Sequence, residues 1–527
     1  MRIAIFTLVL SILVPAVHAQ QQQPPQQPFI EPAEHMHGKR ELRARAAAPY
    51  HTGEWTTLGT IMPINPVHVA LMHNGKVLVI AGSGNDPTNH DLQALVWNPV
   101  AHTVEKEITL SYDMFCDGMV VLPDGHPFVI GGTAKYDSPW IGEKKTSTFS
   151  PATGTFTAKA SMSGGRWYPT GTVLADGNVL AISGLDVGST NNSIDIYHPS
   201  SNTWTHSGSG FTGMPLYPRM TLLPNGKVFE SGSNPNAMTY TPSTGTWTNV
   251  ATTLLGQYRE YGTTVLLPLT PANGFKPRVM ILGGGPNGTS VTATTEIIDL
   301  SAPSPAWTAG PNMVAPRIQL NATLIPGGRV LVSGGSTKDE DGGSAVREAQ
   351  IYHPATNTFS AAETMEFPRL YHSNTILLPD ATVMAVGGNP ARGEYEPHVE
   401  IYSPPYLFKS DGSRATRPAI GSSTTSTIHY GGSFDIHTRY PAAIRSVELI
   451  RAGAVTHAFD MDQRLVGLTY TTGSGVLHAK APADANLAPP GWYLLFIVDE
   501  YNVPSVAHWV HLTKGTATPT YSKKTRR

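Results

Sequence analysis

Short apolar runs that end in glycine recur along the chain as far as about residue 403. A polar turn, a strand-length apolar run and a glycine-containing stop follow one another seven times, at a spacing of about 50 residues. The copies are NGKVLVIAGSG from Asn74, DGHPFVIGG from Asp124, DGNVLAISG from Asp176, NGKVFESG from Asn225, PRVMILGGG from Pro277, GGRVLVSGG from Gly327 and ATVMAVGG from Ala381. A repeat of this length predicts a modular fold built from identical small units.

A second, alternating phrase follows most copies and reads as two strands around a turn, as in IDIYHPSSNTWT from Ile194 and AQIYHPATNTFS from Ala349. Each unit therefore offers about four short strands, none of which can bury both faces alone. We predict an all-β fold whose units stack radially as a seven-bladed, kelch-like β-propeller. GEWTTLG at Gly53–Gly59 belongs to no unit, and we expect it to supply the closing strand of the last blade.

The repeat stops after Ser403, and the segment from about Arg417 to Thr513 alternates apolar and polar residues without the glycine stop. This pattern predicts a separate immunoglobulin-like β-sandwich. The expected organisation is a signal peptide at 1–19, a low-complexity linker or pro-segment at 20–50, the propeller at 51–410, the sandwich at 411–515 and a basic tail at 516–527.

The N-terminus is typical of a secretory signal. Arg2 precedes an apolar run, Ile3–Val14, and a small-residue cleavage site ends at Ala19. That run is too short to span a membrane, so we expect an extracellular protein. The sequons begin at Asn191, Asn287 and Asn321, and in a eukaryotic host they are predicted to be glycosylated at the surface.

Charge gives no reason to expect a nucleic acid as partner. The formal net charge is −2, only 14% of the residues are charged, and no basic stripe is visible. A small neutral substrate fits this composition better. Secretion normally favours disulfides, yet the chain has a single cysteine, which cannot form one within the chain.

Four short motifs carry the residues that could do chemistry. They are SYDMFCDGM with Cys116, GGRWYPTG with Tyr168, PRLYHSN with Tyr371 and His372, and GAVTHAFDMDQR with His457. Taken singly, the thiol is typical of an inert buried cysteine, and the aromatic residues and histidines are typical of packing. The first three motifs, however, open the innermost strands of their blades, and such positions converge near the propeller axis.

Two imidazoles and two phenolates that meet at the axis would suit Cu(II), which prefers nitrogen and oxygen ligands. Zinc suits the set less well, because the only thiol has another candidate role. A bare propeller is equally a platform for binding, since a fold does not define a function. A non-catalytic glycan- or protein-binding propeller therefore remains the alternative at this point.

Several longer stretches follow one another in a recognisable order. They are DMFCDGM, R-W-Y at Arg166–Tyr168, RLYHSN, YSPPYLFKSDGSRATRPAI, THAFDMDQR and GWYLLFIVDEYNVPSVA. With them the chain resembles the galactose oxidase and glyoxal oxidase family of copper radical oxidases, from the first blade to the end of the second domain. The resemblance implies a secreted enzyme that oxidises a small aldehyde or primary alcohol with O2 and releases H2O2, which a peroxidase could consume.

The resemblance also implies the cofactors. Cu(II) would be held by Tyr168, Tyr371, His372 and His457, and Cys116 would be joined to Tyr168 by a thioether bond that eases oxidation of the phenol to a radical. Tyr371 would take the substrate's hydroxyl proton as general base, and the Tyr168 radical would then abstract hydrogen from carbon. An aldehyde would enter the same cycle as its hydrate.

Two departures bear on the substrate. Galactose oxidase covers its cross-linked tyrosine with an indole from the following blade loop, where this chain has Asp186. Trp167 instead gives the R-W-Y pattern of glyoxal oxidases, and it either shields the radical or packs the blade. We therefore expect glyoxal or methylglyoxal to be preferred over galactose, with a galactose oxidase-like alcohol or glycan oxidase as the alternative. Arg219 in LYPRM is a candidate for substrate contact or for bonding within a turn.

Overall fold

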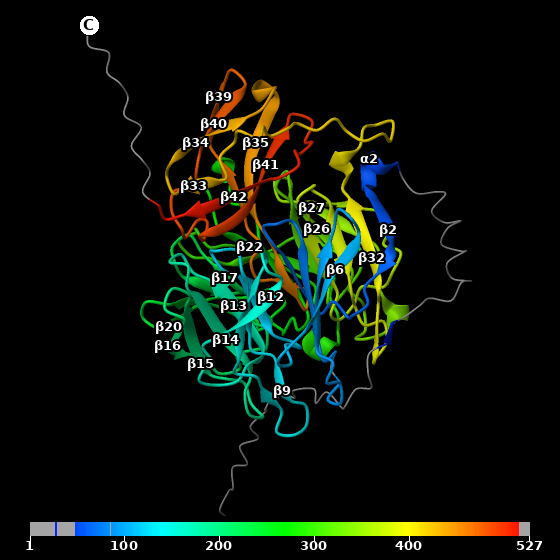
Figure 1. Cartoon of the computed structure of the whole chain (residues 1–527), viewed down its shortest axis with the longest axis vertical. Coiled ribbons are helices and arrows are strands. Elements are labelled where there is room, and N and C mark those ends of the chain that lie inside the picture. The colour runs from blue at the N-terminus through cyan, green and yellow to red at the C-terminus, as the bar shows by residue number, and fades with distance from the viewer. Residues whose placement is uncertain (1–26, 29–47, 85, 516–527) are drawn as a thin grey trace, which may run out of the picture.

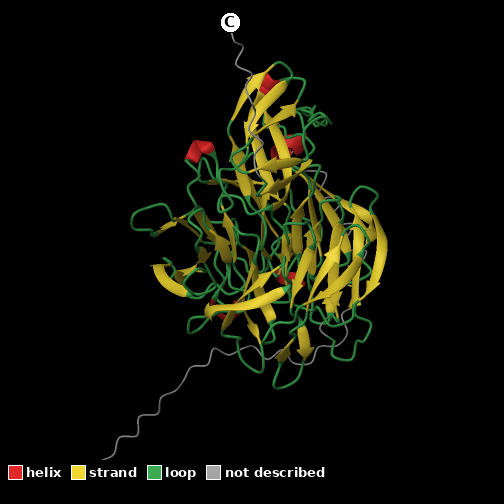
Figure 2. Ribbon diagram, turned by 60° about the vertical axis from the view of Figure 1, so that its left-hand side comes forward, coloured by secondary structure: helices red, strands yellow, loops and turns green. Residues whose placement is uncertain are grey.

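The computed structural model describes residues 27–28, 48–84 and 86–515. The predicted signal peptide at 1–19 and basic tail at 516–527 lie outside these residues, as does most of the predicted linker. The regular elements of the described chain are almost all strands, joined by loops and turns (Figure 2). Its helical elements are short: α2 (Pro49–Thr52), η1 (Pro271–Asn273), η2 (Pro286–Gly288), η3 (Gly342–Ser344), η4 (Pro405–Leu407) and η5 (Pro441–Ala443).

Seven antiparallel sheets form a propeller, and the first strand of each blade lies nearest the axis. Blade 1 contains β3 (His68–Leu71), β4 (Val77–Gly82), β5 (Gln93–Asn98) and β6 (Thr103–Thr109), and blade 2 contains β7 (Gly118–Val121), β8 (Pro127–Ile130), β11 (Thr146–Ser150) and β12 (Thr155–Lys159). Blade 3 contains β13 (Trp167–Val173), β14 (Val179–Leu185), β15 (Ser193–His198) and β16 (Thr203–Ser209), and blade 4 contains β17 (Met220–Leu222), β18 (Val228–Glu230), β19 (Asn236–Thr241) and β20 (Thr246–Thr252). Blade 5 contains β21 (Thr263–Leu266), β22 (Arg278–Leu282), β23 (Thr295–Asp299) and β24 (Trp307–Ala309), and blade 6 contains β25 (Asn321–Ile325), β26 (Arg329–Ser333), β27 (Gln350–His353) and β28 (Thr358–Ala361). Blade 7 contains β29 (Asn374–Leu377), β30 (Val383–Val386), β32 (His398–Ser403) and β2 (Glu54–Ile61).

The N-terminal strand closes the ring. β2 pairs with β32 of the last blade, so that Trp55 faces Tyr402 across the two strands. The two rings lie 4.8 Å apart and both are buried. The prediction for Gly53–Gly59 is thereby confirmed, and the pairing ties the two ends of the propeller together.

The glycine stops have a steric reason. Gly131 ends the second strand of blade 2 with a φ of +76°, and a Cβ atom there would lie 2.1 Å from the carbonyl oxygen of Arg166. Only glycine lets the entry segment of the next blade pass so closely. Arg166 itself is fully buried and pairs with Asp195 of β15 at 2.6 Å. Arg369 makes the equivalent bond to Glu400 of β32 at 2.9 Å.

A β-sandwich follows the propeller and lies at one end of the molecule (Figure 1). One sheet contains β33 (Thr427–His429), β42 (His508–Thr513), β41 (Gly491–Asp499), β35 (Ile444–Arg451) and β38 (Leu465–Leu468), and the other contains β34 (Ser433–His437), β40 (Val476–Lys480) and β39 (Tyr470–Gly473). Buried residues of both sheets share one hydrophobic cluster, which also contains residues of blades 4 and 5. The predicted all-β architecture, a propeller followed by a sandwich, is confirmed.

The sandwich sends one hairpin back into the propeller. β36 (Ala454–Thr456) pairs with β3, the innermost strand of blade 1, with Thr456 opposite His68, and β37 (Phe459–Asp460) completes the hairpin. His457 lies in the turn between these two strands. The second domain thus delivers a histidine to the propeller axis.

The prediction of surface glycosylation is wrong for two of the sequons. Asn191 is buried and donates to the carbonyl oxygen of Gly165 at 3.0 Å. Asn321 begins β25, is 2% exposed and donates to the hydroxyl of Ser373 at 3.1 Å. Both amides already satisfy the folded backbone, so neither can carry a glycan in this fold.

Candidate metal centre

The structure brings the five sequence-predicted residues together at the propeller axis. Cys116 precedes β7, Tyr168 lies in β13, Tyr371 and His372 precede β29, and His457 comes from the hairpin of the sandwich. The Cys116 sulfur lies 3.4 Å from Nε2 of His457 and 3.8 Å from Nε2 of His372. The Tyr168 and Tyr371 hydroxyl oxygens are 3.2 Å apart. All five side chains are less than a tenth exposed.

Both histidines are held in the tautomer that a metal needs. Nδ1 of His372 lies 2.7 Å from Oδ1 of Asn389, which can only accept, so this nitrogen carries the hydrogen. Nδ1 of His457 lies 2.7 Å from the hydroxyl oxygen of Thr456. That hydroxyl donates its own hydrogen to the carbonyl of Val67 at 3.1 Å, so it accepts from the imidazole. Each Nε2 is therefore left with a free lone pair for a metal.

Burial keeps the imidazoles neutral. It lowers the pKa of His372 to about 3, against a smaller opposing effect of the Asn389 hydrogen bond. Burial also lowers the pKa of His457, and His372 adds to that effect. Burial raises the pKa of Tyr168 and Tyr371, and a bound cation would offset this by favouring the phenolates. Two neutral imidazole nitrogens beside two phenol oxygens are a donor set that fits Cu(II).

Four of the five residues hold the backbone in the left-handed region. The φ angles are +55° at Cys116, +69° at Tyr168, +65° at His372 and +47° at His457. Such angles cost of order 1–3 kcal/mol for residues other than glycine and cluster at functional sites. Three of these residues lie at or near the entries of innermost strands and His457 lies in the hairpin turn, so the left-handed positions come together at the metal centre.

Trp167 covers Tyr168. The two rings are 11° from parallel with centroids 5.4 Å apart, although the residues are neighbours in β13. Asp186 stands where galactose oxidase has an indole. It accepts a hydrogen bond from the backbone N–H of Gly165 at 2.8 Å and so fixes the turn ahead of Trp167. The stacking partner of Tyr168 therefore comes from its own strand.

Arg219 is bonded to backbone within the fold. Its guanidinium donates to the carbonyl oxygens of Gly262 at 2.9 Å, Tyr217 at 3.2 Å and His457 at 3.4 Å. These bonds reach beyond a local turn, to the next blade and to the sandwich hairpin. Arg219 thereby links blades 4 and 5 to the turn that carries His457.

Three further residues surround the centre and escaped the sequence reading. Tyr217, Tyr261 and Gln319 stand at the entries of blades 4, 5 and 6, with φ angles of +45°, +56° and +59°. The Tyr217 ring lies 4.6 Å from His457, and the Tyr261 ring lies 6.0 Å from Tyr371. All three precede the innermost strand of their blade by two or three residues, as Cys116 and His372 do, so aligning the repeats on that position would have found them.

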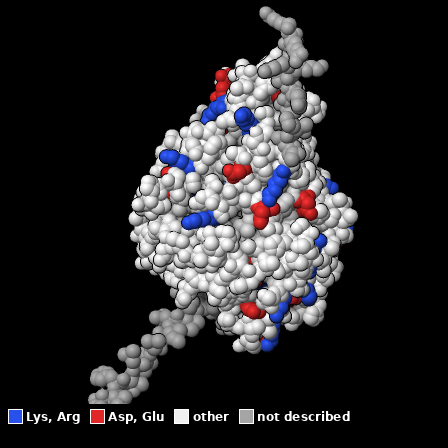
Figure 3. Space-filling view, turned by 90° about the vertical axis from the view of Figure 1, so that its left-hand side faces the viewer, with Lys and Arg blue, Asp and Glu red and all other residues white. Residues whose placement is uncertain are grey.

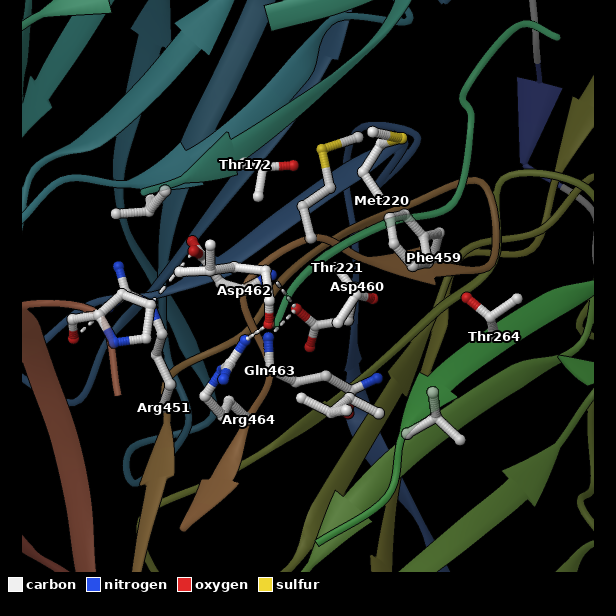
Figure 4. A pocket seen from close by; sticks show the side chains of 16 residues that line it. Thr172, Met220, Thr221, Thr264, Arg451, Phe459, Asp460, Asp462, Gln463 and Arg464 are labelled. Atoms are coloured by element: carbon white, nitrogen blue, oxygen red, sulfur yellow. Dashed lines mark hydrogen bonds and ion pairs between the residues drawn. The ribbon is translucent and has the colours of Figure 1, made fainter. Parts of the chain in front are cut away.

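The hairpin that carries His457 is fixed at its base by the acidic part of the THAFDMDQR motif. Oδ1 of Asp460 accepts from three backbone N–H groups, those of Ala454 at 3.0 Å, Asp462 at 3.0 Å and Gln463 at 2.9 Å. These bonds join the start and the end of the hairpin, so its turn is held from behind. Figure 4 shows Asp460 beside Asp462 and Gln463 in a pocket of about 40 Å³.

The end of the motif docks onto separate blades. Asp462 accepts from Nε of Arg451 at 3.2 Å and from the backbone N–H of Val121 in blade 2. Gln463 donates to the carbonyl of Ala322 and accepts from the N–H of Leu324, both in blade 6, at 2.8 and 2.9 Å. The position of His457 is therefore fixed by opposite sides of the propeller.

Comparisons with known proteins decide the family. The model described as glyoxal oxidase N-terminus matches residues 83–406, and the galactose oxidase-like early set domain matches residues 417–512. The chain belongs to the glyoxal oxidase family. Among its relatives is a galactose oxidase of Gibberella zeae, 27% identical over 489 residues, which cover 86% of this chain and 70% of the relative.

Two other similarities cover nearly whole proteins. The aldehyde oxidase GLOX of Vitis pseudoreticulata is 26% identical over 531 residues, or 87% of this chain and 97% of the relative. A solved fungal alcohol oxidase of the AA5 family, in complex with copper, superposes with a TM-score of 0.77 at 26% identity, covering 88% of this chain and all of that one. This glyoxal oxidase family member is therefore a copper radical oxidase, as predicted from the sequence.

Asn389 should tune the metal affinity without touching the metal. Asn389→Ala removes the acceptor that fixes the His372 tautomer, so the affinity for copper should fall by about 10- to 100-fold, the usual effect of losing such a partner. Titration of the metal-free variant with copper measures this. An affinity equal to that of the wild type would show that the Asn389 bond does not prepare His372.

Proposed function

We propose that the chain is a secreted copper radical oxidase that oxidises small aldehydes of the glyoxal or methylglyoxal type, as their hydrates, and primary alcohols more slowly, with O2 as acceptor and H2O2 as product. The observation that carries the proposal is the parallel stack of Trp167 on Tyr168 at 5.4 Å, beside two imidazoles whose Nε2 atoms converge with the Cys116 sulfur. In the described ranges 27–28, 48–84 and 86–515, no helix is long and apolar enough to cross a membrane. Secretion is proposed from the signal-like residues 1–19.

The proposed ligands are Nε2 of His372 and His457 and the oxygens of Tyr168 and Tyr371. Bound copper supplies one of the two oxidising equivalents and the site at which O2 is reduced. Tyr168, joined to Cys116 by a thioether, holds the other equivalent as a radical. Because sulfur donates electron density to the ring, the cross-link eases formation of that radical and spreads it over more atoms.

The protein's own residues then divide the reaction between a base and a radical. Tyr371 accepts the hydroxyl proton of the alcohol or hydrate, and the 3.2 Å between its hydroxyl and that of Tyr168 supports a division of the reaction in which both act on one bound substrate. Tyr168 accepts a hydrogen atom from that carbon. The substrate thus loses two protons and two electrons, which O2 later recovers as H2O2.

Charge and stacking favour a small, weakly polar substrate. Trp167 already covers the Tyr168 face, and Asp186 is bonded to the backbone of Gly165, so neither offers a free platform for a sugar ring. The face shown in Figure 3 carries only scattered acidic and basic side chains, with no patch of one sign to attract a charged polymer.

A substrate panel tests the proposal. Copper-loaded, oxidised protein is assayed for peroxide release with glyoxal, methylglyoxal, simple primary alcohols, galactose and glycans that end in galactose. We expect the aldehydes to have the highest kcat/KM and galactose the lowest. Efficient galactose oxidation with inert aldehydes would reverse the substrate order, and absence of peroxide with every compound would leave only a binding propeller. A peroxidase is the proposed consumer of the H2O2.

A further inference from the structure

A third aromatic ring, that of Tyr136, contacts Trp167 on the way from the metal centre toward the surface. Tyr136 lies between β9 (Thr133–Lys135) and β10 (Ile141–Gly142), a small hairpin on the side of the molecule away from the sandwich (Figure 1). Its ring meets Trp167 edge to face, with centroids 5.3 Å apart and planes at 76°. Trp167 in turn lies 5.4 Å from Tyr168. Tyr168 is only 8% exposed, whereas Tyr136 is partly open to solvent.

Tyr136 also has a proton acceptor in place. Its hydroxyl donates to Oδ2 of Asp113 at 2.7 Å, and the hydroxyl of Ser83 lies against it. Oδ1 of Asp113 accepts from the backbone N–H groups of Ser83 at 2.9 Å and Phe115 at 3.0 Å, so the carboxylate is held still. Burial raises the pKa of Asp113, which makes it a better base for this phenol.

The neighbouring tyrosines are bonded differently. Tyr217, whose ring meets Tyr168 edge to face, donates to the backbone carbonyl of Asp117 at 2.6 Å, and Tyr197 of β15 donates to the amide oxygen of Asn202 at 2.9 Å. Neither a backbone carbonyl nor an amide oxygen is a useful base for a phenol proton. Removing an electron from a phenol makes its proton strongly acidic, so a phenol bonded to a carboxylate is much easier to oxidise than one bonded to an amide.

We propose that Tyr136 and Asp113, with Trp167, form a relay that carries one electron from Tyr168 to an oxidant at the surface and so generates the Tyr168 radical. This inference rests on the proposed function, because only a radical oxidase needs its buried phenol oxidised before the first turnover. The oxidant is any one-electron, outer-sphere acceptor that reaches the β9–β10 hairpin.

The steps balance in electrons and protons. The external acceptor takes one electron from Tyr136, and the phenol proton moves to the Asp113 carboxylate. An electron passes from Trp167 to the Tyr136 radical, which recovers its proton from Asp113, and an electron from the Tyr168 phenolate refills Trp167. The net change is one electron from Tyr168 to the acceptor, with no proton gained or lost.

The test follows radical formation rather than turnover. Copper-loaded, cross-linked protein is first reduced by one electron, so that Tyr168 carries no radical. It is then mixed with ferricyanide in the absence of O2 and substrate. Formation of the radical is followed by absorption and by EPR. Tyr136→Phe and Asp113→Asn should each slow its formation by about tenfold or more, since each removes a charge-assisted hydrogen bond from the rate-limiting oxidation. The rate should be lower in D2O than in H2O for the wild type, and this difference should vanish in both variants.

Control measurements separate the possible failures. Tyr197→Phe, which removes a buried phenol hydroxyl outside the relay, should form the radical at the wild-type rate. Once fully oxidised, Tyr136→Phe should turn over glyoxal as fast as the wild type. Equal radical formation in wild type and Tyr136→Phe, with the same isotope effect, would overturn the relay while leaving the proposed function intact. A copper-loaded wild type that forms no radical with ferricyanide would overturn both.

Discussion

Replacing Cys116 by serine should remove nearly all oxidase activity while leaving the copper bound. The serine keeps the size of the buried side chain, which is fully enclosed, but cannot form a thioether with Tyr168. Without the sulfur the phenol is harder to oxidise, and we expect turnover to fall by at least about a thousandfold, equivalent to ~4 kcal/mol of barrier. Peroxide release and copper content, measured on the same preparation, give the two readouts.

The copper measurement is the internal control for this variant. The proposed ligands are two nitrogens and two oxygens, so the loss of the Cys116 sulfur should not empty the site. Activity within tenfold of the wild type at full copper loading would show that the thioether is not needed. Loss of copper together with activity would instead make Cys116 a ligand.

Replacing either histidine by alanine should lower the copper content itself, in contrast to the serine variant of Cys116, since it removes a ligand. For His372→Ala and His457→Ala we expect the copper affinity to fall by at least about a hundredfold, beyond the loss expected for a supporting residue such as Asn389. Tyr371→Phe should retain copper and instead lose about 10²–10⁴ in turnover, because it removes the proposed base. Atomic absorption on dialysed protein, together with steady-state rates, distinguishes the two kinds of variant.

Folding must be checked alongside. The blade that His372 enters is fixed by the Arg369–Glu400 bond, and the hairpin that carries His457 is fixed by Asp460. Both variants should therefore unfold cooperatively near the wild-type metal-free temperature. Full copper content in both histidine variants would refute the assignment of these residues as ligands.

The repeat made the blades predictable from sequence. Each glycine stop marks where the next blade's entry crosses, as Gly131 and Arg166 show, so the period carries the topology directly. The entry residues Cys116 and Tyr168 could be placed at the axis by their distance from that stop. Pairing of Glu54–Ile61 with blade 7 was predictable for the same reason, since a unit without its own partner must close the ring.

Other features of the centre were beyond a linear reading. Asn389 and Thr456 fix the two imidazoles through contacts that depend on how loops meet. Asn191 and Asn321 match the sequon pattern, but that pattern does not show that their amides are needed inside the fold. The stack of Trp167 on Tyr168 depends on the left-handed backbone at Tyr168, which tyrosine adopts only under tertiary constraint.

The covalent state of Cys116 is the most direct test of the account. Metal-free, reduced protein is loaded with copper in O2, and its intact mass and its reactivity to a thiol alkylating reagent are measured after denaturation. We predict that the mass falls by two hydrogen atoms, that the thiol no longer reacts, and that the denatured chain migrates faster on a gel because residues 116 and 168 now close a loop. A freely alkylated Cys116 in fully copper-loaded, aerobically matured protein would contradict the radical mechanism.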